Sequence, residues 1–332
     1  MIMVTCWERC ESRGSRTVLR EADGEVPLVY SPYILAIQDQ MRLNFTSHSA
    51  KTDLGEIGKA GKTIQYGIIQ HSVLAVSERN EPFGLLSVEY FDYSHLDQSI
   101  NRDKRKVEAK ANIFWIKSLD EMRKNLRESD KKLITVADRE GDFYEFIFNL
   151  IQHKEEFVIR SKHNRILGEY YKKNGQKLRE KLEQSAVKGL VKINIQDVKS
   201  REIKEIQLNV KALAISLPVP KQLIKSTEEK SYKSITLNVV SAYNDEYEWV
   251  LLTSLPVETL EQLTEVLKIY KARWHIEDYH KVLKTGYQVD EIYLHSSRKA
   301  ITNLLTVSAV SACRLYWLIY MGRTEKHLKV DQ

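Results

Sequence analysis

The chain has 332 residues, of which 42% are hydrophobic and 29% are charged, a balance that can bury a core and excludes disorder throughout. Lys and Arg total 51 against 45 Asp and Glu, so the net charge of +6 permits a nucleic-acid partner only where basic residues gather locally. Three cysteines exclude a disulfide framework and favour a reducing, cytoplasmic compartment. We expect no membrane span, because no apolar run approaches the ~20 residues that one needs.

The N-terminal part of the chain changes from irregular to ordered near residue 30. Residues 1–29 are polar without a period, and we expect a loose tail. The apolar run 33–37 predicts a buried strand that ends at Asp39. Three glycines among lysines in 51–62 predict a loop.

The next segments alternate between strands and helices. Runs 71–76 and 84–90 are rich in β-forming residues and are separated by a turn, so they predict paired strands. An apolar face among charges predicts a helix within 102–128. The apolar run 133–137 predicts a second buried strand, which ends at Asp138.

A β-rich segment separates two parts of this α/β pattern. Within 166–248 hydrophobic and polar residues alternate strictly in three places, 191–195, 206–210 and 235–239. We therefore predict a mostly β subdomain inserted into an α/β chain. The remaining elements are expected as helices at 143–150, 259–284 and 301–321 and as strands at 156–160 and 249–253.

The predicted strand ends supply two carboxylates, Asp39 and Asp138. Each alone is more typical of a turn residue or a helix N-cap. A predicted helix near the C-terminus adds a third, Glu277, on a mixed stripe with Tyr270, Arg273 and Lys284. In a continuous α-helix these four residues lie at about 0°, 300°, 340° and 320° around the axis, on one face. Such a stripe is usually solvated and held by pairs such as Arg273–Glu277.

The same stripe has a functional interpretation. Three carboxylates suit a site for two Mg²⁺ ions, because these ions prefer oxygen ligands and support phosphoryl transfer without a His base or an activated Ser. The Arg and Lys side chains of the stripe suit the positioning of phosphate groups.

Three segments resemble motifs of DDE transposases of the insertion-sequence-four type. Residues 270–286 resemble the Y-x2-R-x3-E-x6-K signature of that family, Ile37-Gln38-Asp39 its first-aspartate motif, and 136–142 its D-R-E-x-D motif. The strand at 248–253 resembles the one that follows the family's β insertion. The resemblance covers about residues 30 to 325.

The resemblance implies a role for each matching residue. Asp39, Asp138 and Glu277 would bind two Mg²⁺ ions, for which Mn²⁺ is an alternative, and would catalyse phosphodiester cleavage. Contacts to DNA would come from the signature residues Tyr270, Arg273 and Lys284, from Trp249 stacking on a flipped base, and from Arg160, Lys162 and His163 at a strand end. The sequence leaves open that Trp249 is a core or interdomain tryptophan, that the basic residues form a solvated loop, and that Asp142 is a structural cap.

The resemblance also implies the architecture. We expect an RNase H-like α/β core, a mixed sheet flanked by helices, in two parts at 30–165 and 249–325. The β insertion at 166–248 separates these parts, and a short tail follows at 326–332. The partners would be transposon-end and target DNA, with a homodimer as the active synaptic complex and no membrane.

Three functional hypotheses follow. The first is an active cut-and-paste transposase. The second is a truncated remnant, inactive or inhibitory, because few residues precede Asp39 or follow Lys284, where the family carries DNA-recognition and dimerisation domains. The third is a DNA-binding or structural protein whose carboxylates only cap turns.

Overall fold

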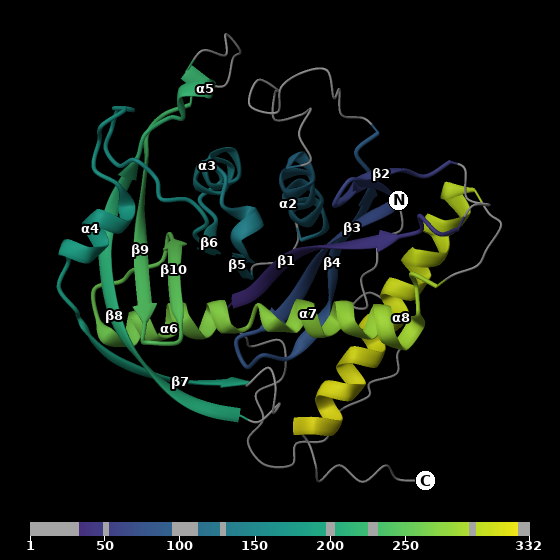
Figure 1. Cartoon of the computed structure of the whole chain (residues 1–332). Helices are drawn as coiled ribbons and strands as arrows, with labels where there is room; N and C mark the ends of the chain where they lie inside the picture. The colour runs from purple at the N-terminus through teal and green to yellow at the C-terminus, as the bar shows by residue number, and fades with distance from the viewer. Residues whose placement is uncertain are drawn as a thin grey trace. The chain divides into compact units, whose positions relative to one another are not determined.

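The computed structural model describes most of the chain as two compact units (Figure 1). Unit 1 comprises Met1–Lys132 and Trp274–Gln332, and unit 2 comprises Leu133–Arg273. The structure describes residues 33–48, 53–94, 112–126, 131–196, 203–224, 232–291 and 297–324. The tails expected at 1–29 and 326–332 lie outside these ranges, as does the first part of the helix expected from 102.

The strands of unit 1 are organised around one long strand, β3 (Thr63–Ser77). It pairs antiparallel with β1 (Tyr33–Asn44) along one edge, and along the other with β2 (Gly55–Ala60) and then β4 (Pro82–Phe91). Because it has neighbours on both edges and helices over it, β3 is buried from Gly67 to its end. The paired strands expected at 71–76 and 84–90 are confirmed.

Two predictions for this region are wrong. The strand expected to end at Asp39 continues to Asn44, because Met41 and Leu43 are buried on alternate positions while the strand keeps its pairing with β3. Part of the loop expected at 51–62 is strand β2, whose glycines and lysines form a bulged edge pairing with β3. Asp39 therefore lies within a strand and not at its end.

Helices cover both faces of the unit 1 strands. His71 on β3 contacts Trp115 of α2 (Ile113–Asn125), while Gln70 reaches Tyr279 of α7 (Trp274–Lys281). Successive residues of a strand point to opposite faces, so α2 and α7 cover opposite sides. A π-helical segment, Val282–Gly286, follows α7, and α8 (Arg298–Thr324) packs on β4.

Helix α8 is long and apolar enough to cross a membrane by length and composition alone, although the apolar runs of the sequence predict no span. Core helices of globular proteins pass the same test. The buried residues of α8 recur at helical spacing and face the interior of unit 1: Ile301, Leu305, Ala309, Ala312 and Tyr316.

The strands of unit 2 form a mixed arrangement. Strands β5 (Lys132–Ala137) and β6 (Glu156–Arg160) pair in parallel, and β10 (Glu248–Thr253) pairs antiparallel with β6. The series then continues antiparallel through the β-rich segment, in the order β9 (Ile235–Tyr243), β8 (Ile203–Leu217) and β7 (Gly189–Gln196). The alternation at 191–195, 206–210 and 235–239 therefore predicted three real strands.

Four α-helices are described in the resolved part of unit 2. They are α3 (Tyr144–Gln152), which packs on β6, α4 (Leu178–Gln184) on β8, the short α5 (Lys221–Ile224), and α6 (Leu260–Lys271) on β6 and β7. A capping box fixes the start of α6: Thr259 Oγ1 accepts from Gln262 N–H, and the Gln262 side chain accepts from Thr259 N–H.

The helix expected as one element at 259–284 is interrupted. Helix α6 ends at Lys271 and α7 begins at Trp274, and the π-helical segment starts at Val282. The boundary between the units falls at the same interruption. The four signature residues therefore do not share one face of a continuous α-helix, and the angles calculated for such a helix do not apply.

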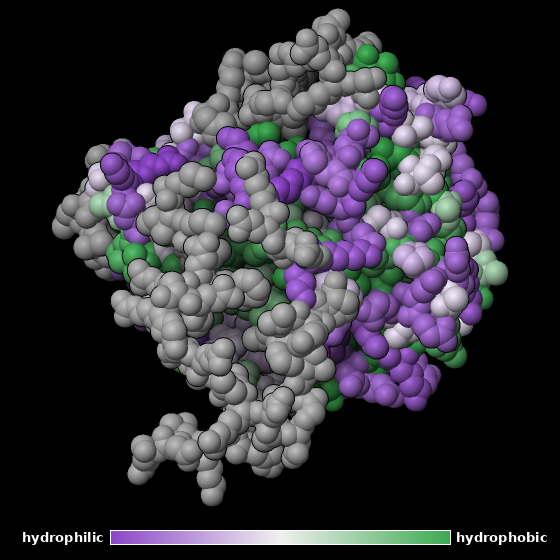
Figure 2. All heavy atoms as spheres, turned by 180° about the vertical axis from the view of Figure 1, so that it is seen from behind, coloured by the Kyte–Doolittle hydropathy of each residue, from purple (hydrophilic) through white to green (hydrophobic). Residues whose placement is uncertain are grey.

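The fold class is nevertheless as expected: α/β, with a mixed sheet and flanking helices, consistent with an RNase H-like core. Figure 2 shows that hydrophilic side chains predominate over the visible described surface of one face, with hydrophobic ones scattered among them.

The buried His71 predicts a pH-dependent stability. Burial, with a smaller contribution from His280, lowers its pKa from 6.5 to about 3 in the folded chain. Between these pH values the unfolded chain therefore binds more protons than the folded chain. His71 does not lower the free energy of unfolding above pH 6.5, and it lowers this free energy increasingly as the pH falls below 6.5. We expect His71 to cost about 1.4 kcal/mol of unfolding free energy per pH unit below 6.5. Urea unfolding at pH 7 and pH 5 should show a smaller pH effect for His71→Gln, and an equal effect would contradict this.

Candidate functional site

Asp39 lies in the middle of β1, directly opposite Ser72 of β3. Residues paired across an antiparallel sheet point to the same face, and this face is the one that α7 covers. One carboxylate oxygen, Oδ1, accepts a hydrogen bond from Gln40 N–H at 2.8 Å. The other, Oδ2, lies 4.0 Å from His280 Nδ1 on α7. Pairing of the strands thus directs the Asp39 carboxylate toward α7.

Helix α7 also carries Glu277, three residues before His280 and therefore on a neighbouring position of the same helix surface. Glu277 is partly exposed, whereas His280 is buried. Burial, assisted by the nearby charge of Lys284, lowers the pKa of His280 to about 3, so its imidazole is neutral at pH 7. Unit 1 thus brings Asp39 to the helix of Glu277, with Lys284 on the segment that follows.

Buried polar side chains that the sequence did not indicate lie on both faces of β3. On the face that α7 covers, Gln70 Nε2 donates to Ser72 Oγ at 2.9 Å and to the Tyr279 hydroxyl at 3.4 Å. On the opposite face, His71 Nε2 donates to Gln38 Oε1 of β1 at 3.2 Å. The sequence signal for these groups is that polar residues interrupt otherwise apolar strand segments.

Asp138 follows β5 in unit 2 and is partly exposed. Its Oδ1 caps the 3-10 turn Arg139–Gly141 by accepting from Glu140 N–H at 2.7 Å. The capping interpretation of Asp138 is therefore correct for one oxygen, Oδ1.

The donor chemistry of Asp39, Asp138 and Glu277 fits a hard divalent cation, because all three offer carboxylate oxygens at partly exposed positions. Within neither unit do three His, Cys, Asp or Glu side chains of the described residues form a group that could hold a metal ion. A metal-binding role for the triad remains a prediction.

The signature residues of unit 2 form a second cluster. Tyr270 and Arg273 are buried, and the guanidinium groups of Arg273 and of Arg160, from the end of β6, act electrostatically on the Tyr270 hydroxyl; Arg273 Cζ lies 6.0 Å from the Tyr270 ring centroid. Burial raises the pKa of Tyr270, and the two guanidinium groups oppose this rise. Trp249 packs edge-on against Tyr270 at 5.3 Å between ring centroids. Arg160 also donates to the Glu248 carbonyl at 3.1 Å.

The other predicted DNA contacts differ in exposure. Trp249 is only 8% exposed, the position of a core tryptophan, so the alternative left open by the sequence describes its packing. Lys162 and His163, which follow β6, are exposed. Burial of part of its ring lowers the pKa of His163 despite the nearby Asp142. The sequence also has a basic run at 102–106, a further candidate for DNA contact, which lies outside the described residues.

Comparison with known protein families gives one finding. The family described as transposase DDE domain matches residues 108–313, which is more than half of the chain. Asp138 and Glu277 lie within the matched segment, as do Tyr270, Arg273 and Lys284. Asp39 precedes it.

The Tyr270 hydroxyl should contribute to the stability of the chain. Tyr270→Phe removes a buried polar group next to two guanidinium groups, so we expect a loss of about 1–3 kcal/mol of unfolding free energy. Tyr170→Phe is the matched control, since Tyr170 is 75% exposed and should change stability by less than about 0.5 kcal/mol. Chemical unfolding checks both, and equal effects would show that the hydroxyl contributes nothing.

Proposed function

Because the chain belongs to the family of transposase DDE domains, we propose that it is a DNA transposase of the insertion-sequence-four type that moves DNA by cut-and-paste. The observation that carries this proposal is in unit 1, where pairing of β1 with β3 directs Asp39 to the helix that bears Glu277. The Y-x2-R-x3-E-x6-K pattern at 270–286 supports the finer family assignment.

Asp39, Asp138 and Glu277 are proposed as the carboxylates that bind two Mg²⁺ ions, for which Mn²⁺ can substitute. When bound, such ions lower the pKa of water and stabilise the charge that develops on the leaving oxygen. Each residue supplies a partly exposed carboxylate in its unit, and the Asp39 carboxylate accepts a backbone hydrogen bond from Gln40 at Oδ1 and faces α7 at Oδ2.

The reaction proposed at this site begins with hydrolysis of one strand at the transposon end. Water attacks the phosphorus atom, the bond to the 3′-oxygen breaks, and a 3′-hydroxyl is freed. That hydroxyl attacks the opposite strand to form a hairpin, which water reopens, and the same hydroxyl then joins to target DNA. Each step exchanges one P–O bond for another, so no oxidant or reductant is needed.

The basic residues of the signature would orient the DNA. Arg273, Tyr270 and Arg160 in unit 2 bring together guanidinium and phenol groups of the kind that suits phosphate oxygens, and contact with DNA requires that Tyr270 and Arg273 become exposed. Lys284 in unit 1 adds a point charge after α7. A stacking role for Trp249 on a flipped base requires that it leave its buried position against Tyr270. We propose a homodimer on paired transposon ends, acting in the cytoplasm.

Cleavage should depend on each of the three carboxylates. Asp39→Asn, Asp138→Asn and Glu277→Gln keep the side-chain size but remove the charge, and we expect each to lower Mg²⁺-dependent cleavage at least about 1,000-fold, as loss of several kcal/mol of transition-state stabilisation implies. The assay is nicking of a supercoiled plasmid that carries the DNA flanking the gene.

The exposed Asp245→Asn is the control and should cleave at the rate of the original chain. Circular dichroism would verify that every variant is folded. Normal nicking by folded Glu277→Gln would show that the assignment of the third carboxylate is wrong.

A further inference from the structure

A buried carboxylate in unit 2 lies outside the proposed catalytic triad. Asp142 follows the 3-10 turn after β5, and its side chain is 0% exposed. It does not cap α3, whose N-cap is Phe143, as a structural capping residue there would. All of the hydrogen bonds described for its carboxylate come instead from a segment about twenty residues later, Ser161–Arg165, which we call the β6 loop.

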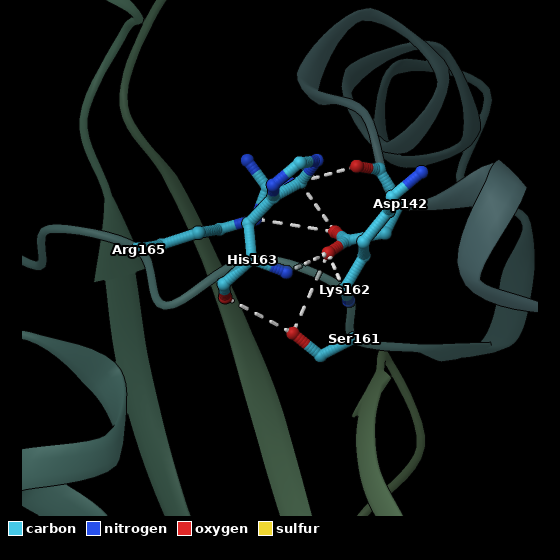
Figure 3. A network of polar contacts seen from close by, with 5 residues as sticks. All are labelled: Asp142, Ser161, Lys162, His163 and Arg165. Atoms are coloured by element: carbon cyan, nitrogen blue, oxygen red, sulfur yellow. Dashed lines mark hydrogen bonds and ion pairs between the residues drawn. The ribbon is translucent and has the colours of Figure 1, made fainter.

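The donors of the β6 loop converge on the Asp142 carboxylate (Figure 3). Oδ2 accepts from the backbone N–H of Lys162 at 2.6 Å and of His163 at 3.0 Å, and from Ser161 Oγ at 3.4 Å. Oδ1 accepts from Arg165 Nε at 3.1 Å and from its Nη2, which also donates to the Asp142 carbonyl at 2.8 Å. One side chain therefore fixes the loop backbone and its last residue.

The β6 loop is also held from its other side. Ser161 N–H donates to the Val250 carbonyl at 2.7 Å, and Leu178 N–H donates to the Arg165 carbonyl at 2.8 Å. Because the amides of Lys162 and His163 point inward to Asp142, these residues are anchored by their backbone while their side chains are exposed. The loop is thus a fixed support for two outward side chains.

The charges of this arrangement have a consequence for an anionic ligand. A carboxylate beneath a DNA-binding loop repels phosphate unless a cation neutralises it, and Arg165, 15% exposed, forms the ion pair with Asp142. Arg165 is thereby occupied, and Lys162 remains as the exposed cation of the loop, next to Arg160 at the end of β6.

We infer that Asp142 is a positioning residue for DNA: it holds the β6 loop in the conformation that presents Lys162 and His163 to phosphodiester groups of the DNA backbone. This inference rests on the proposed function and extends it to a residue that touches neither DNA nor metal. Asp142 acts only through the backbone and through Arg165.

The substitution Asp142→Asn separates positioning from simple charge. It removes one negative charge, so charge counting predicts tighter DNA binding with a steeper salt dependence. The side-chain NH2 group of Asn is a donor and cannot accept the hydrogen bonds that one Asp142 oxygen accepts from the β6 loop. A positioning role therefore predicts weaker DNA binding instead. We expect the affinity for a fluorescent duplex of mixed sequence to fall roughly tenfold, and the slope of log affinity against log salt to fall by about one. Fluorescence anisotropy over a series of KCl concentrations measures both.

A double-mutant cycle identifies the side chain that is positioned. Lys162→Ala should weaken binding of the original chain by a similar factor, and it should have little further effect in the Asp142→Asn background. Asp92→Asn is the matched control, because Asp92 is an equally buried carboxylate paired with Arg298 in unit 1. It makes the same charge change and should not weaken binding.

Arg165→Lys provides a second variant in case Asp142→Asn does not fold. This substitution keeps the positive charge but loses the paired guanidinium donors. A positioning role for Asp142 therefore predicts weaker DNA binding, whereas charge counting predicts no change in DNA binding. Folded variants that bind as tightly as the original chain, or independent effects of Asp142→Asn and Lys162→Ala, would overturn the inference while leaving the proposed function intact. An original chain that binds no duplex at any salt concentration would overturn both.

Discussion

A carboxylate in the middle of a buried strand is the constraint on which unit 1 depends. Asp39 has buried neighbours before it in β1, and an ionised group at such a position is costly unless polar groups or water reach it. The structure meets this cost with a backbone donor from Gln40 and with a helix face, α7, that is polar where it approaches the carboxylate. Glu277 lies on the same polar face of α7. The packing that accommodates the Asp39 carboxylate therefore also brings Asp39 to the helix that carries Glu277.

Unit 2 also stabilises a buried carboxylate with polar groups, but there the carboxylate is completely enclosed. Asp142 is fully enclosed and satisfied by backbone amides and a guanidinium, which leaves it no oxygen for chemistry. Asp138, four residues earlier, uses Oδ1 for a cap and stays partly exposed. Two aspartates of one short motif thus differ in the number of donors that reach them. That difference separates a candidate ligand from a structural anchor.

Much of the fold followed from local patterns, because alternation and apolar runs report burial directly. β7, β8 and β9 were predicted from alternation alone, and β5, β6 and β10 from their apolar runs. The length of β1 was not predicted, since Gln38-Asp39-Gln40 has the composition of a strand end. Strand β2 was not predicted either, because its glycines and lysines are typical of a loop and only pairing with β3 orders it.

The residues of the candidate site could be predicted from the sequence, but the contacts between those residues could not. The motif spacing identified the signature residues, yet nothing local indicates that Arg160 acts on the Tyr270 hydroxyl, or that Asp142 anchors a loop beyond the next strand. These partners are remote in sequence and meet only through the β5–β6–β10 pairing. The break between α6 and α7 was missed because Ala272 and Arg273 have no sequence feature that ends a helix.

That break gives the spacing of the signature another meaning. Tyr270 and Arg273 belong to one unit, and Glu277 and Lys284 to the other. Three residues lie between Arg273 and Glu277, and the four residue steps that join them span at most about 14 Å in a fully extended chain. The segment is therefore a covalent connection of fixed maximum length between a buried guanidinium group and a carboxylate that belong to separate units. Any insertion there would lengthen the connection even if both units kept their own folds.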